Sequence, residues 1–247
     1  MAKKLKDYYD IDYLDSFSNT IANAIDAFDQ ARFLELTISY INDLEFNERQ
    51  VLIAKALYET IDSDYHQTIL SFKKVLGPEL KGNSGAFSVG WWLWPVGKYV
   101  ELYGADYFES TISFSKELTK RFTSEYCMRP LIMKYPEEAL AVLKQWSRDD
   151  NERVRRLSSE CLRIRLPWAK KIYTAVEYFD DYYTILNNLK DDEDKYIQKS
   201  VANNLNDLYK EDKEKFEIII NSWDTKDMSE SCKWIIKHGS RNIDKHQ

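Results

Sequence analysis

The part of the sequence best suited to chemistry is NERVRRLSSECLRIRLPWAK, residues 151–170, which sets two carboxylates and an indole among six Lys and Arg residues. The carboxylates are Glu152 and Glu160, and the indole is Trp168. Positive side chains at this density attract a polyanion. A carboxylate among them can either pair with an arginine or stabilise a positive charge that develops during a reaction. The stretch therefore predicts either a structural ion pair or an electrostatic catalytic site.

A helical wheel sorts this stretch into an apolar face and a charged flank. The residues that it directs towards the core are Val154, Leu157 and Cys161. Those on the charged flank are Arg153, Arg156, Glu160 and Arg163. We expect a ligand to meet this flank.

Neighbouring helices repeat the combination of a carboxylate beside a cation. On the next helix, whose core residues are Ile197, Val201 and Leu208, the matching flank carries Lys199, Asn203 and Asp207. The preceding helix spaces Arg121, Glu125 and Arg129 four residues apart. Pairs at such spacing usually form ion pairs worth only about 0.2–0.5 kcal/mol, so the spacing alone leaves the structural interpretation open.

Composition places the chain among ordinary globular proteins. Of its 247 residues, 44% are hydrophobic and 31% are charged, and no apolar run approaches the roughly 20 residues that a membrane span needs. The opening residues lack the apolar block of a signal peptide, so we expect a cytoplasmic protein with no membrane partner. Three distant cysteines and three scattered histidines lead us to expect reduced thiols, no metal site and no cofactor.

Charge is distributed unevenly along this acidic chain of net charge −6. Residues 1–66 hold six basic and thirteen acidic side chains, whereas 144–171 hold nine basic and four acidic. The local field decides where a polyanion binds, so the basic segment is the candidate surface.

The periodicity of the apolar residues predicts an all-α protein. We expect paired antiparallel helices, and the run WSRDDNERVRRLSSE (146–160) aligns with LKDDEDKYIQKSVAN (189–203) at a 43-residue offset. A period near 40 with two helices per unit is typical of HEAT-like, armadillo-type repeats. The expected architecture is one domain over 1–247, a monomeric helical-repeat solenoid with a concave binding face.

No nucleophile or metalloprotease motif is present: the sequence has neither G-x-S-x-G nor H-E-x-x-H. Carboxylates therefore remain as the acid–base or electrostatic groups if the protein is an enzyme.

Several long runs resemble the AlkC branch of the AlkC/AlkD alkylpurine DNA glycosylases, HEAT-like proteins of bacterial DNA repair. They are LTKRFTSEYCMRP, WSRDDNERVRRLSSE, RLPWAKK and SVANNLNDLYK, supported by FDQARFLELTISYINDLEFNERQ, FSVGWWLWPVGKYVELYG and KWIIKHGSR. The resemblance covers nearly the whole chain. Residues 161–164 depart from the family's pattern, which affects the link towards Trp168.

The resemblance implies roles for individual residues. It assigns catalysis to the carboxylates Glu125, Glu160 and Asp207, and substrate binding to Trp168 and Arg156. Phosphate binding is expected from Arg153, Arg163, Arg165 and Lys199.

The implied activity is that of a DNA glycosylase that hydrolyses the N-glycosidic bond of a cationic alkylated base. The expected substrate is 3-methyladenine, with 3-methylcytosine as a second one, in double-stranded DNA and without base flipping. Two alternatives stay open: a catalytically inactive HEAT-like protein that binds damaged or branched DNA, and a scaffold for a protein partner.

Overall fold

The computed structural model describes residues 3–82 and 88–243, and the regular elements among them are helices. A single isolated bridge between Phe28 and Ile61 is the one β-type pairing in these ranges. The prediction of an all-α protein is confirmed. None of the described helices is both long and apolar enough to cross a membrane.

The chain divides into two compact units, Met1–Cys127 and Met128–Gln247. The expectation of one domain over 1–247 stays a prediction. Helix α7 (Glu125–Lys134) begins in the first unit and ends in the second. The other elements of the first unit are η1 (Leu5–Tyr8), α1 (Ile11–Ala22), α2 (Gln30–Ile41), α3 (Phe46–Thr60), α4 (Tyr65–Val75), η2 (Trp91–Leu93), α5 (Trp94–Tyr103) and α6 (Phe108–Thr119).

Aromatic side chains dominate the core of the first unit. The hydroxyl of Tyr9 donates to the carbonyl oxygen of Trp91 at 2.7 Å, and that of Tyr13 donates to the carbonyl of Trp92 at 2.8 Å. Trp94 packs edge-on against Phe46, with the ring centroids 4.9 Å apart. The two hydrogen bonds anchor the N-terminal segment to η2, because each buried hydroxyl finds a backbone acceptor there.

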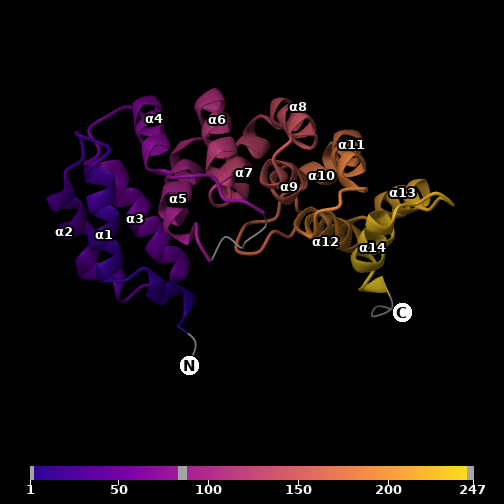
Figure 1. Cartoon of the computed structure of the whole chain (residues 1–247), viewed down its shortest axis with the longest axis horizontal. Helices are drawn as coiled ribbons and strands as arrows, with labels where there is room; N and C mark the ends of the chain where they lie inside the picture. Colours follow the sequence, from indigo (N-terminus) through magenta and orange to yellow (C-terminus); the bar gives the residue numbers. More distant parts are fainter. Residues whose placement is uncertain (1–2, 83–87, 244–247) are drawn as a thin grey trace. The chain divides into compact units, whose positions relative to one another are not determined.

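The second unit pairs its helices in two layers. Its elements are α8 (Pro136–Trp146), α9 (Glu152–Glu160), α10 (Thr174–Glu177), α11 (Phe179–Leu189), α12 (Lys195–Glu211), α13 (Lys213–Trp223) and α14 (Glu230–Gly239). Helices α8 and α11 pack side by side, and α12 lies between α9 and α14 in the other layer (Figure 1). This is the two-helix repeat that the 43-residue offset predicts.

Equivalent caps begin the two repeated helices. The side chain of Asn151 accepts from the backbone N–H groups of Arg153 and Val154, and Asp194 accepts from that of Tyr196. Asn and Asp at this position satisfy donors that the first helical turn leaves unpaired. The predicted core residues of both helices have no solvent exposure: Val154, Leu157, Cys161, Ile197, Val201 and Leu208.

Helix α9 ends at Glu160. Beyond it the chain continues in turns, with Leu162, Ile164 and Leu166 all buried. These apolar side chains hold the segment against the core after the helix has ended. The result is an irregular loop over residues 161–173 that carries Arg163, Arg165 and Trp168.

Candidate active site

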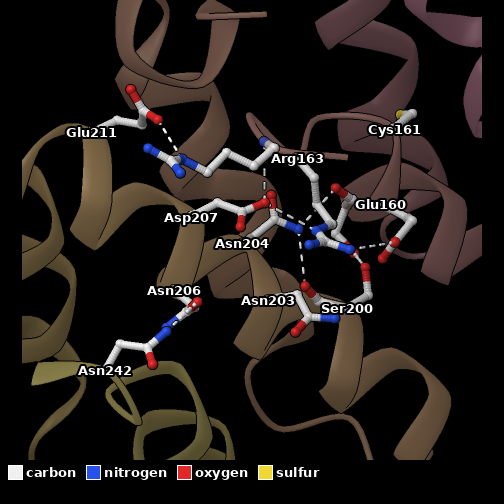
Figure 2. Close-up of polar contacts among 12 residues, drawn as sticks. Glu160, Cys161, Arg163, Ser200, Asn203, Asn204, Asn206, Asp207, Glu211 and Asn242 are labelled. Carbon is white, nitrogen blue, oxygen red and sulfur yellow. Dashed lines mark hydrogen bonds and ion pairs between the residues drawn. The ribbon is translucent and has the colours of Figure 1, made fainter. Parts of the chain in front are cut away.

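The guanidinium of Arg163 lies between two buried carboxylates in the second unit (Figure 2). Its Nη1 contacts Glu160 Oε1 at 3.0 Å, and its Nε donates to Asp207 Oδ2 at 3.1 Å. Glu160 and Asp207 are 5% and 4% exposed. Glu160 ends α9 and Asp207 lies near the end of α12, so Arg163 joins two neighbouring repeats through charge-assisted hydrogen bonds.

Facing turns of α9 and α12 complete the surroundings of Glu160. On α9, Arg156 Nη2 lies 3.2 Å from Glu160 Oε1. On α12, Tyr196 places its ring 4.7 Å from the guanidinium carbon of Arg156, and the Ser200 hydroxyl reaches Glu160. Arg156 and Glu160 are four residues apart on α9, and Tyr196 and Ser200 are four residues apart on α12. One turn of each helix therefore places two residues opposite their partners on the other helix.

The carboxyl of Glu160 is held ionised by these contacts. Burial alone would raise its pKa, but the positive charges of Arg156 and Arg163 and the hydrogen bond from Ser200 outweigh burial and lower that pKa below its ordinary value. The site therefore presents a fixed anion at neutral pH.

Asp207 also ties the loop to α12. Its Oδ2 accepts from the backbone N–H of Arg165 at 3.2 Å. The side chain of Arg165 points elsewhere and pairs with Glu211, which Lys171 also contacts at 2.8 Å. The loop is thus attached to α12 at two acidic residues one helical turn apart.

The same loop presents Trp168 with its indole 57% exposed. Its φ of 61° lies in the left-handed region, where a bulky side chain costs about 1–3 kcal/mol. A buried arginine of α7, Arg129, donates to the carbonyl oxygens of Cys161 at 3.2 Å, of Arg163 at 2.9 Å and of Lys170. Surrounding structure therefore holds the loop in a strained path.

Arg153 does not lie where the helical wheel predicts. It is 1% exposed, so the wheel's assignment of its side chain to the open flank is wrong, while its role in phosphate binding stays a prediction. Helix α9 packs against α8, α11 and α12, and this leaves little of its circumference open to solvent. Arg121 likewise pairs with Glu117 at 2.7 Å rather than forming a site with the residues of its own flank.

The remaining predicted residues fall into two groups. The second unit brings Glu160, Asp207, Arg156 and Arg163 together, whereas Lys199 and Arg165 lie exposed. Glu125 begins α7 in the first unit and is 7% exposed. Its convergence with the other two carboxylates stays a prediction.

Sequence reasoning missed Tyr196, Ser200 and the contacts of Arg129. Tyr196 and Ser200 carry a signal, because their spacing of four matches that of Arg156 and Glu160 on the facing helix. Arg129 was noted only for its spacing from Glu125, and nothing in the sequence indicates that it binds the loop, since its partners there are backbone carbonyls of an aperiodic segment.

The arrangement can stabilise positive charge and hold an anion, but it offers no metal site. Among residues 3–82 and 88–243, no group of three His, Cys, Asp or Glu side chains is placed to hold a metal ion. Cys127, Cys161 and Cys232 are buried and are not joined to one another by disulfides.

Comparisons with known proteins converge on DNA repair. A sequence model of the DNA alkylation repair enzyme family matches residues 122–233. The uncharacterized protein YhaZ of Bacillus subtilis (strain 168) is 34% identical over 240 residues, covering 97% of this chain and 64% of YhaZ. The structure of Pseudomonas fluorescens alkylpurine DNA glycosylase AlkC, bound to DNA containing an abasic site analog, matches with a TM-score of 0.86 and 30% identity. That match covers 99% of this chain and 66% of AlkC, so the chain spans just under two thirds of either relative.

The ion pairs around Glu160 predict a specific pH dependence of stability. Because its pKa is lower in the folded protein than the unfolded value of about 4.3, ionised Glu160 stabilises the fold above about pH 4.3, and this contribution is lost as the pH falls through the folded pKa. We expect Glu160→Gln to lower the free energy of unfolding at pH 7 by about 3 kcal/mol, since it removes the buried carboxylate that Arg156 and Arg163 share.

Urea unfolding at pH 7 and at pH 3.5 measures both effects. Glu160→Gln should lose less stability than the wild type between these two pH values. Glu230→Gln is the control, because the Glu230 side chain is 90% exposed. Equal stability of Glu160→Gln and the wild type at pH 7 would show that the ion pairs contribute nothing.

Proposed function

We propose that the chain belongs to the AlkC branch of the AlkC/AlkD family and is a DNA glycosylase acting on cationic alkylated bases. The leading substrate is 3-methyladenine in double-stranded DNA, with 3-methylcytosine as a second one. The observation that carries the proposal is the pair of buried carboxylates, Glu160 and Asp207, held by one guanidinium beside the loop that presents Trp168.

The chemistry of a cationic base suits a site built of carboxylates. Such a base leaves the sugar as a neutral molecule, so its departure needs no general acid. What remains is to stabilise the positive charge that develops on the deoxyribose and to place a water molecule for attack. Glu160 and Asp207, with Glu125 as the proposed third carboxylate, supply the negative field, and one of them orients the water.

DNA binding would change the charge balance of this site. Without a ligand, the two carboxylates are matched by Arg156 and Arg163. The side chain of Arg156 is 12% exposed, so one edge of it reaches the surface. A DNA phosphate that pairs with Arg156 would compensate its charge and leave the carboxylates with a net negative field at the sugar.

The exposure of Trp168 favours recognition of a base that stays in the helix. An indole that stands 57% exposed on a loop can pack against a deoxyribose or a stacked nucleotide from outside, whereas a flipped base is usually gripped between buried side chains. A cationic nucleotide would gain about 0.5–2 kcal/mol from the face of the ring.

One observation favours a second function, that of a catalytically inactive reader of damaged DNA. Both carboxylates already have arginine partners, and ion pairs of this kind can serve the fold alone. A reader would keep the binding surface and lack base release, so binding and release must be measured separately.

Release of 3-methyladenine from methylated double-stranded DNA tests the glycosylase directly. We expect the wild type to release the base under single-turnover conditions and Asp207→Asn to release it about 100-fold more slowly, because the variant removes one charge from the transition state. Glu230→Gln, which changes an exposed carboxylate, should match the wild type.

The same assay decides between the two functions. Normal binding of methylated DNA without release of any base would make the protein a reader. If Asp207→Asn released the base at the wild-type rate, Asp207 would have no role in catalysis.

Phosphate contacts predict a salt dependence of binding. Lys199 is exposed on α12, eight residues before Asp207, and we propose that it contacts the DNA backbone. Lys199→Ala should weaken binding to every duplex sequence alike and reduce the slope of log affinity against log salt by about 1. Fluorescence anisotropy across salt concentrations measures the slope. The control is Lys226→Ala, because Lys226 is an exposed lysine between α13 and α14. An equal slope for both variants would exclude a contact between Lys199 and the DNA backbone.

A further inference from the structure

The loop over residues 161–173 carries three predicted site residues without the support of a helix or strand. A side chain from another element fixes its path. Arg129, on α7, is 4% exposed and donates to backbone carbonyl oxygens at Cys161, Arg163 and Lys170. Two of these acceptors lie at the beginning of the loop and one lies close to its end, so one guanidinium holds both ends of the loop.

The contacts of Arg129 bracket Trp168. Arg163 lies five residues before the tryptophan and Lys170 two residues after it, and both of their carbonyls accept from the same side chain. Trp168 itself has a φ of 61°. A bulky residue relaxes out of this conformation unless its flanking backbone is held, and its exposed indole contributes little burial of its own.

An arginine is suited to this task by its shape and by its constant charge. The planar guanidinium offers five N–H donors in a fixed fork and stays protonated, whereas a lysine offers a compact ammonium on a flexible stem. Three carbonyls in different directions match the fork. A lysine at this position would reach one or two of them.

We propose that Arg129 is a positioning residue that sets Trp168 and Arg163 for the reaction at Glu160 and Asp207. It acts through the backbone of the loop and does not contact the substrate. The effect on base release rests on the proposed glycosylase function, while the effect on the position of Trp168 does not.

Two arginines elsewhere in the chain provide matched controls. Arg49, in the first unit, donates to the carbonyl oxygens of Lys6, Tyr9, Asn42 and Leu44. Arg155, in the second unit, donates to those of Asp149 and Asp150 and pairs with Asp192. Replacing either with lysine removes the same kind of bond without touching the loop over 161–173.

The test is 19F NMR of the full chain labelled with 5-fluorotryptophan, in which Trp168→Phe identifies the Trp168 resonance. We expect Arg129→Lys to shift or broaden that resonance and to leave those of Trp223 and Trp234 in place. Arg49→Lys and Arg155→Lys should leave the Trp168 resonance unchanged. An unchanged Trp168 resonance in Arg129→Lys would overturn the proposal, whether or not the protein releases bases.

Single-turnover kinetics supply the functional readout. Arg129→Lys should release 3-methyladenine at least about tenfold more slowly at saturating protein, while its affinity for undamaged duplex stays within about twofold of the wild type. The two control variants should release the base at the wild-type rate. Arg129→Gln serves as a second variant, and failure of both Arg129 variants to fold, with both controls folded, would assign Arg129 to the fold and overturn the proposal.

Discussion

The guanidinium of Arg163 is the contact on which the candidate site depends, because it holds two buried carboxylates of like charge in one place. Without a cation beside it, burial would raise the pKa of Glu160 and favour its neutral form, which would weaken the negative field. With it, both carboxylates are hydrogen-bonded, one from each of two neighbouring repeats. Arg163 also lies near the beginning of the irregular loop. The same residue therefore affects both the charge balance of the site and the path of the loop.

This arrangement carries an inherent tension. The arginines that keep Glu160 ionised also compensate the negative charge that the proposed glycosylase would use. In the proposed enzyme, a polyanionic substrate would resolve the tension, because its phosphates would compete for the guanidinium of Arg156, one edge of which reaches the surface, and leave the carboxylates with a net negative charge. Such a site would have its strongest negative field only with DNA bound.

Much of the fold follows from local rules that the sequence displays. Helices α9 and α12 follow from their apolar period and from the Asn151 and Asp194 caps, and their similar repeats predicted the layered pairing. The carboxylates of the second unit also follow, since family motifs and helical spacing agree on Glu160 and Asp207.

The wheel failed for Arg153, because it gives a direction around one axis and says nothing of how many helices surround that axis. The contacts between Arg129 and the loop could not be predicted, because backbone carbonyl acceptors leave no pattern in the side-chain sequence.

The most direct test of the central claim is a double-mutant cycle of Glu160→Gln and Asp207→Asn, with the single-turnover rate of 3-methyladenine release as the readout. If Arg163 makes the two carboxylates one electrostatic unit, the double variant should be no more than about threefold slower than the slower single variant. Multiplication of the two single effects would mean that the carboxylates act independently, and this would contradict the site described here.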